Sequence, residues 1–173
     1  MNEERPVSLA CAVLTVSDTR SAGDDTSGNL LAQSLAREGH QCVRRDIVRH
    51  DRYQIRRILS EWIADPEVQV IITSGGTGFA PRDQTQAAVQ PLLDREVPGF
   101  GELFRQLSHG QIGSSAVQSG AFAGLANQTL IFCLPGSNNA CETAWEHILR
   151  EQLDSRHRPC NFATQFKKRE EED

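Results

Sequence analysis

The residues best suited to chemistry form a glycine-rich loop that directly follows an apolar run. The run from Val68 to Ile72 is short and rich in β-branched side chains, and it leads into Thr73, Ser74, Gly75, Gly76, Thr77 and Gly78. This order predicts a buried strand that ends in a tight loop. The N–H groups of such a loop suit an anion, often a phosphate. For this motif alone, a plain glycine turn between a strand and a helix is an equally good interpretation.

Two aspartates, Asp51 and Asp83, stand at expected junctions between a loop and a helix. One interpretation is that each carboxylate caps the N-terminus of its helix. The other is that both hold Mg²⁺ beside a phosphate loop, as in phosphoryl-transfer sites. The two roles conflict in part, because a carboxylate fully used as a cap is poorly placed to hold a metal. Arg82, beside Asp83, is a candidate for neutralising phosphate charge.

Several standard catalytic motifs are absent from the sequence. No Lys follows the glycines, so the loop is not a Walker A motif, and Pro81 breaks the dinucleotide-binding pattern of spaced glycines. The nucleophile-elbow pattern is also missing, and no Ser has a His and an acid at a recognisable spacing. We therefore expect no nucleophilic hydrolase chemistry.

Apolar runs alternate with helix-like segments along the chain. Leu9–Val16, Gln41–Val48 and Thr129–Leu134 are expected strands, in addition to the run that ends at Ser74. Helices are expected after Thr26 and Ser27, which are candidate N-caps, and after Asp51. Further helical segments are expected after Asp83, around the Phe100–Leu107 repeat, and from Ala140 to about Leu153.

This alternation predicts a mostly parallel sheet between helix layers, a three-layer α/β/α fold. Ligands of such sheets bind beyond the carboxyl ends of the strands. Three loops with small polar residues follow strand ends, and parallel strands would bring them to one edge. These loops are Ser17-Asp18, Thr73–Gly78, and Pro135, Gly136, Ser137 and Asn138.

Composition is that of an ordinary globular chain. The 173 residues suffice for one domain, expected over residues 9–162, with an N-terminal extension (1–8) and a charged, disordered tail (163–173). The net charge of −5 argues against nucleic-acid binding. No signal-peptide or membrane-spanning pattern is present, and the five scattered cysteines suit buried thiols in a reducing compartment. We therefore expect a cytoplasmic protein.

Taken in order, the motifs resemble the MogA/MoaB family of molybdenum-cofactor biosynthesis proteins over about Leu9 to Phe162. The motifs that carry this resemblance are Leu14–Asp18, Asp25–Gly28, Thr73–Gly78, Arg82-Asp83, Arg95–Glu102 and Leu134–Ser137. Gln118-Ser119, Cys141 with Ala144-Trp145, and Arg158–Phe162 are similar to the bacterial MoaB branch. Each motif is weak by itself, whereas the ordered set is highly specific.

The resemblance implies a fold that binds molybdopterin and assembles as a trimer or, in the MoaB branch, a hexamer. Active family members adenylylate molybdopterin with Mg²⁺ and ATP. The resemblance places their functional carboxylates on Asp51 and Asp83, and their nucleotide and pterin-phosphate loops on Thr73–Gly78 and Pro135–Asn138. It also places Ser17-Asp18, Arg82 and Ser119 at the binding pocket.

Adenylyl transfer needs no protein nucleophile, because the attacking group is the substrate's own phosphate. Two departures nevertheless leave turnover open. Relatives commonly carry Arg where this chain has Gly120, and the last loop is Pro-Gly-Ser-Asn-Asn instead of Pro-Gly-x-Pro. Two hypotheses follow: an Mg-ATP-dependent molybdopterin adenylyltransferase, or a molybdopterin-binding accessory protein without efficient turnover.

Overall fold

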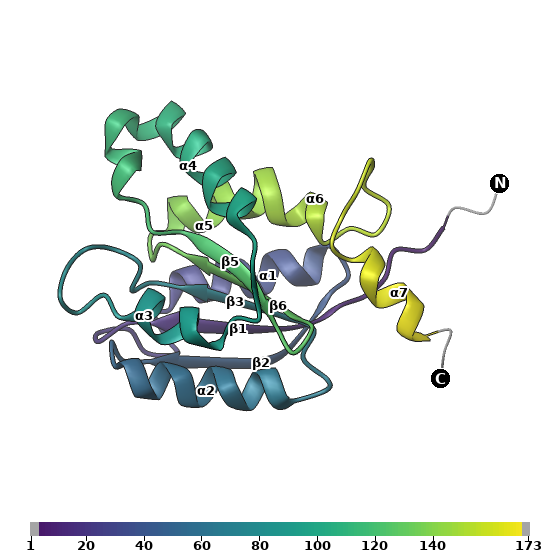
Figure 1. Ribbon diagram of the computed structural model, residues 1–173, viewed down its shortest axis with the longest axis horizontal. Helices are drawn as coiled ribbons and strands as arrows, with labels where there is room; N and C mark the ends of the chain where they lie inside the picture. Colours follow the sequence, from purple (N-terminus) through teal and green to yellow (C-terminus); the bar gives the residue numbers. More distant parts are fainter. Residues whose placement is uncertain (1–3, 171–173) are drawn as a thin grey trace.

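Six strands form one sheet in the order β2-β1-β3-β6-β5-β4 in the computed structural model, which describes residues 4–170 (Figure 1). The strands are β1 (Ala10–Val16), β2 (Gln41–Val48), β3 (Val70–Ser74), β4 (Arg95–Glu96), β5 (Phe122–Ala126) and β6 (Thr129–Leu134). The first four in the sheet order are parallel, whereas β5 runs antiparallel to both of its neighbours, β6 and β4. The expected mostly parallel sheet is therefore confirmed.

Helices cover both faces of this sheet, as the three-layer prediction requires (Figure 1). They are α1 (Thr26–Arg37), α2 (Arg52–Ala64), α3 (Thr85–Val89), α4 (Pro98–Ile112), α5 (Asn138–Ala144), α6 (Arg150–Gln152) and α7 (Thr164–Glu170). A 3-10 segment, η2 (Gly113–Gln118), follows α4, and a π-helical turn, Trp145–Leu149, joins α5 to α6. None of the described helices is both long and apolar enough to cross a membrane.

Strand β1 separates the two hydrophobic cores because its side chains alternate between the faces of the sheet. Cys11 and Val13 pack with α1, α4 and α5, and Phe100 and Phe104 fill the centre of that core. Leu14 and its neighbours on the other face pack against α2 and α3. Both faces are buried, which explains the continuous apolar run in the sequence.

The parallel register brings three strand ends to the same edge of the sheet. Leu14 pairs with Thr73, and Thr73 pairs with Cys133, so β1, β3 and β6 finish side by side. The loops after Val16, Ser74 and Leu134 therefore leave the sheet together. This confirms the predicted convergence.

Two local predictions were wrong. The N-cap of α1 is Asp25, whose Oδ1 accepts a hydrogen bond from the Gly28 backbone N–H (3.0 Å), and not Thr26 or Ser27, which lie inside the helix. The expected disordered tail instead begins with α7, because Ala163 and Phe166 are apolar enough to be buried in the core. Residues 171–173 of that predicted tail lie outside the described residues.

Candidate functional site

A polar cleft of about 330 Å³ opens at the carboxyl ends of β1, β3 and β6. It is lined by segments from all three strand ends and from the loop between η2 and β5. The lining residues are Thr15, Val16, Ser17, Arg20, Ser27, His50, Ser74, Gly75, Gly76, Thr77, Gly78, Arg82, Asp83, Gln118, Ser119, Gly120, Pro135 and Gly136. Its position is the one expected for a ligand site in a parallel sheet.

The glycine loop at the floor of the cleft needs its glycines for geometric reasons. Gly75 and Gly76 have φ values of +99° and +73°, which L side chains rarely adopt. A Cβ on Gly75 would lie 2.3 Å from the carbonyl oxygen of Val16, and one on Gly76 would lie 2.2 Å from Thr85 Oγ1. Thr85 Oγ1 in turn donates to the carbonyl oxygen of Gly75 (2.8 Å). The loop is therefore a fixed, closely packed element and not a simple turn.

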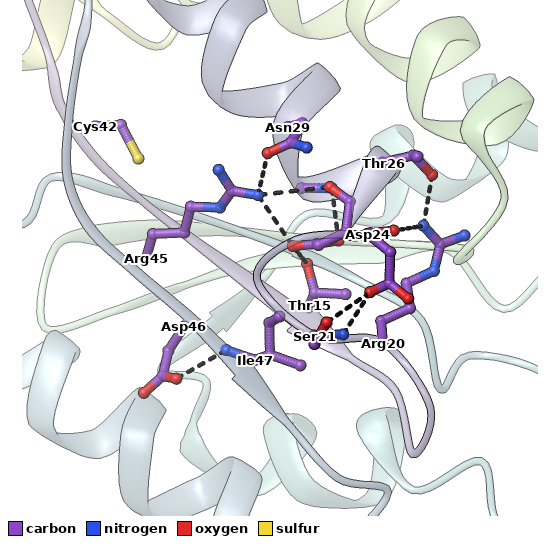
Figure 2. A network of polar contacts seen from close by, with 12 residues as sticks. Thr15, Arg20, Ser21, Asp24, Thr26, Asn29, Cys42, Arg45, Asp46 and Ile47 are labelled. Atoms are coloured by element: carbon purple, nitrogen blue, oxygen red, sulfur yellow. Dashed lines mark hydrogen bonds and ion pairs between the residues drawn. The ribbon is translucent and has the colours of Figure 1, made fainter.

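A buried carboxylate, Asp25, organises the side of the cleft that follows β1. Its Oδ2 accepts hydrogen bonds from Thr15 Oγ1 (2.8 Å) and from Arg45 Nη2 on β2 (3.1 Å). Arg45 Nη2 also donates to Asn29 Oδ1 (2.6 Å), as Figure 2 shows. Asp25 is fully buried, and Thr15 lines the cleft. The carboxylate therefore fixes the end of β1 to the start of α1.

The loop between β1 and α1 also fixes a cation. Arg20 Nη1 donates to the carbonyl oxygen of Asp24 (3.2 Å) and to Thr26 Oγ1 (Figure 2). The backbone N–H of Arg20 donates to Ser17 Oγ (3.1 Å). Asp24 Oδ1 accepts from the backbone N–H and the hydroxyl of Ser21, and these hydrogen bonds lower the pKa of the Asp24 carboxyl. Arg20 lines the cleft, and sequence reasoning missed it.

Asp83 is the one carboxylate among the residues that line the cleft. Its Oδ2 accepts from the backbone N–H of Ala80 (3.0 Å), which closes a turn that returns the chain toward α3. A Cβ on Gly78 would lie 2.7 Å from that oxygen, so Gly78 leaves room for the carboxylate. Arg82 lines the cleft beside it but is exposed, and no other described residue pairs with its side chain.

Asp51 does not join Asp83 in the lining of the cleft. It caps α2, with Oδ1 accepting from the backbone N–H groups of Tyr53 (3.0 Å) and Gln54 (2.8 Å). Its neighbour His50 does line the cleft. The capping interpretation of Asp51 is thus observed, while its metal-binding role stays a prediction. No group of three potential metal-binding side chains occurs among the described residues.

The other predicted site residues divide between the cleft and its supports. Ser17, Ser74 to Gly78, Ser119, Pro135 and Gly136 line it. Asp18 Oδ1 instead accepts from the backbone N–H of His50 (3.0 Å), and Thr73 is buried within β3. Ser137 caps α5 by accepting from the backbone N–H of Ala140, and Asn138 accepts from Thr26 Oγ1. These four residues position the lining instead of forming it.

Gly120 fits the cleft so closely that no side chain has room there. A Cβ at this position would lie 2.0 Å from the carbonyl oxygen of Thr77. Arg105 on α4 donates through Nη1 to the carbonyl oxygens of Ser119 (3.3 Å) and Ala121 (3.0 Å), on both sides of the glycine. Gly120, the position where relatives commonly carry Arg, therefore lies on a loop that Arg105 from α4 holds in place.

Unpartnered polar atoms concentrate in the cleft. Five buried side-chain nitrogen or oxygen atoms of the described residues have no hydrogen-bond partner, and four belong to residues that line it. The four are Ser27 Oγ, His50 Nδ1, Ser74 Oγ and Ser119 Oγ. Because an unsatisfied buried polar group costs free energy, such a concentration indicates a site that takes a polar ligand or ordered water.

The nearby thiols are unsuited to nucleophilic chemistry. Burial raises the pKa of Cys133 and of Cys141 to about 12, and the negative charge of Asp25 adds to the effect on Cys141. Both thiols are therefore protonated near neutral pH, and neither lines the cleft. The prediction of buried structural thiols is confirmed for these two and for Cys11, but it was wrong for Cys42 and Cys160, which are exposed.

Comparison with known proteins identifies relatives over most of the chain. Residues 12–155 match a family described as "Probable molybdopterin binding domain". The chain is 54% identical to molybdenum cofactor biosynthesis protein B of Escherichia coli K12, over 91% of this chain and 92% of the relative. It is 45% identical to the protein of the same name from Staphylococcus carnosus, over 84% and 87%.

Solved structures agree with this match. One is a crystal structure of a molybdenum cofactor biosynthesis protein B, with a TM-score of 0.84, 38% identity and coverage of 87% of this chain and 94% of that one. Another is the tungsten cofactor synthesizing protein MoaB from Pyrococcus furiosus, with a TM-score of 0.77, 35% identity and coverage of 85% and 94%. The fold class and the MoaB resemblance inferred from the motifs are both confirmed.

Proposed function

The chain belongs to the molybdopterin-binding domain family, and on that premise we propose that its cleft binds molybdopterin and adenylylates it with Mg²⁺ and ATP. The observation that carries this proposal is the set of four buried, unpartnered polar atoms around a glycine loop at the carboxyl edge of the sheet. Hydroxyls and an imidazole of this kind suit the oxygens of phosphate groups.

The charge of the cleft also supports a polyanionic ligand. Arg20 and Arg82 line it together with a single carboxylate, Asp83, although the whole chain has a net charge of −5. A local excess of cations in a concave site attracts and orients anions. The two phosphate-bearing substrates of an adenylyl transfer would both gain from this arrangement.

In the proposed reaction, a phosphate oxygen of molybdopterin attacks the α-phosphorus of ATP, and the bond to pyrophosphate breaks. The protein's task is to hold two anions close together and to stabilise the charge of the departing pyrophosphate. Ser27, Ser74 and Ser119 would donate hydroxyl hydrogens to phosphate oxygens, and Arg20 and Arg82 would balance their charge. No residue has to supply a nucleophile, which fits a cleft lined by no cysteine.

Asp83 fits the requirements for holding Mg²⁺. Its Oδ2 is engaged by Ala80, whereas no described residue pairs with its Oδ1. Mg²⁺ in nucleotide sites usually takes one or two carboxylates plus substrate phosphates, so a single carboxylate is compatible with it. Bound there, the ion would neutralise charge on the phosphates. Asp51, beside the cleft-lining His50, stays a proposed second ligand.

Pyrophosphate release from ATP, measured in the presence and absence of molybdopterin, tests this proposal. Release should depend on molybdopterin and should be abolished by Asp83→Asn, whereas molybdopterin binding should stay nearly intact. Asp46→Asn is the matched control, because Asp46 is exposed on β2 and, among the described residues, pairs only with the backbone N–H of Ile47. Release that is unaffected by Asp83→Asn would contradict the assigned role.

A molybdopterin-binding accessory protein without turnover is the second candidate. It is favoured by the position of Asp51, which caps α2 instead of lining the cleft with Asp83. Binding of molybdopterin without any release of pyrophosphate would establish this alternative.

Assembly into a trimer or hexamer is likewise proposed by analogy with the family, and sedimentation of the purified protein measures it directly.

A further inference from the structure

The cleft contains two arginines that the chain holds in very different ways. Arg20 is partly buried, and both of its side-chain hydrogen bonds to the protein are made by Nη1. Arg82 is exposed and has no partner among the described residues. Because ordering a long side chain costs entropy, an arginine that is fixed before binding loses less on contact with a ligand.

Thr26 holds Arg20 by connecting it to the start of α5. Its Oγ1 accepts a hydrogen bond from Arg20 Nη1 and donates one to Asn138 Oδ1 (3.0 Å), at the first residue of α5. Thr26 and Asn138, which are 112 positions apart in the sequence, thus together fix the Arg20 guanidinium. No described residue accepts from Nε or Nη2 of Arg20, so these donors stay available to a ligand.

The same side of the cleft has an independent sign of a ligand. Ser27 follows Thr26 at the start of α1, is 1% exposed and lines the cleft, yet its hydroxyl has no partner among the described residues. Burying a hydroxyl without a hydrogen bond is unfavourable, so a ligand oxygen that paired with it would recover that free energy.

We infer that Arg20 is the pre-organised anion-binding cation of the cleft, that it holds a phosphate oxygen of the ligand beside Ser27, and that Thr26 and Asn138 are its positioning residues. The inference deepens the proposed function, because phosphate is the ligand chemistry assumed there. A guanidinium presents paired N–H donors that match a phosphate group. Arg82 can adapt to the ligand only after binding.

Titration of inorganic pyrophosphate into the full-length protein by calorimetry tests this inference without requiring turnover. Arg20→Gln should weaken pyrophosphate binding about 10- to 100-fold, the loss expected for a hydrogen bond between charged groups. Arg20→Lys should give an intermediate affinity, because it keeps the charge but loses the paired geometry. Thr26→Val should weaken binding about two- to five-fold, since it only releases the guanidinium. The melting temperature should fall by no more than about 4 °C in any of the three variants, because each loses at most two exposed hydrogen bonds.

Arg57→Gln is the matched control, because Arg57 is exposed on α2 and pairs with Glu61 outside the cleft. The inference is overturned if Arg20→Gln binds pyrophosphate as tightly as the unmodified protein, or if the unmodified protein binds none. Unchanged binding by Thr26→Val would refute the positioning role. If Arg20→Gln fails to fold, Arg20→Lys carries the same test. Pyrophosphate binding through Arg20 without release of pyrophosphate from ATP would reject adenylylation but keep this inference.

Discussion

The two sides of the cleft are built on opposite principles. The first wall, residues 15–28, is fixed by a buried carboxylate and by hydrogen bonds to β2 and to Asn138. The second wall, residues 76–84, is anchored at its base by Thr85 but carries the large exposed side chains of Phe79 and Arg82 at its rim. We therefore infer that the first wall holds an anion in a set position and that the second adapts to what is bound.

Removing the buried charge of the first wall should have the largest effect. Asp25→Asn keeps the shape of the side chain but turns one of its two buried acceptor oxygens, which pair with Gly28, Thr15 and Arg45, into a donor, so we expect a loss of about 3 kcal/mol in the free energy of unfolding. Denaturant unfolding measures it. Asp46→Asn on the neighbouring strand should stay within about 0.5 kcal/mol of the unmodified protein. Similar losses in both variants would show that Asp25 does not organise this wall.

Gly120→Ala tests the junction between the second wall and the η2–β5 loop. The new Cβ would lie 2.0 Å from the carbonyl oxygen of Thr77, and relieving this overlap should cost about 2 kcal/mol of stability and weaken anion binding. Gly110→Ala is the control. Gly110 lies within α4 with no atom within 4 Å of the added Cβ, so the change should stabilise the protein by up to about 1 kcal/mol. Equal effects at the two positions would refute the close fit at Gly120.

Protonation of His40, at the end of the sheet opposite the cleft, should change the stability of the protein without changing ligand binding. His40, just before β2, is buried, and its Nδ1 accepts from the backbone N–H of Leu9 (3.1 Å). Burial lowers the pKa of His40, although Glu38 and Asp154 oppose the shift. The unfolded chain therefore binds a proton first as the pH falls below about 6.5, and stability should decrease from there toward the folded-state pKa.

The expected loss between pH 7 and pH 5.5 is at most about 1 kcal/mol, the limit set by protonation of the unfolded chain alone, and denaturant unfolding measures it. His40→Gln lacks this titration and should show a correspondingly flatter pH profile. Pyrophosphate affinity should be the same in this variant and in the unmodified protein at each pH, because His40 lies far from the strand ends that form the cleft. A pyrophosphate affinity that changed with pH in the unmodified protein but not in His40→Gln would show that His40 and the cleft are coupled.

The smallest effect on stability is expected at Ser27. Ser27→Ala removes a buried hydroxyl that has no partner among the described residues, so the free energy of unfolding should change by less than about 0.5 kcal/mol. Pyrophosphate affinity should nevertheless fall several-fold, as seen by calorimetry. A clear loss of stability would mean that the hydroxyl has a structural role, and the first wall would then be less specialised for its ligand.

The sequence predicted the frame of the site well because that frame depends on local patterns. Apolar runs located the strands, and the parallel order made the loops after Val16, Ser74 and Leu134 converge. The glycine loop proved to need its glycines, and Asp83 does line the cleft.

The details that depend on pairing between distant segments were not predictable. Four consecutive residues, Asp24 to Ser27, are all good capping types, and the contacts of Asp25 with Thr15 on β1 and Arg45 on β2 select among them. Arg20 was overlooked because its partner Thr26 is oriented by Asn138, at the start of α5 and remote in the sequence. The fit of Gly120 against Thr77 likewise depends on how two separate loops approach each other.

The salt bridge between Arg45 and Asp25 also has a consequence for how the protein folds. Strand β2 is an edge strand, and it contributes Arg45 to the site only when its pairing with β1 is in the native register. A slip by one residue would turn Arg45 to the other face of the sheet and leave the Asp25 carboxylate buried without its cation. The buried carboxylate of Asp25 therefore disfavours incorrect registers between β1 and β2. A chain with a misaligned edge strand cannot form the first wall, and a competent binding site marks a correctly completed sheet.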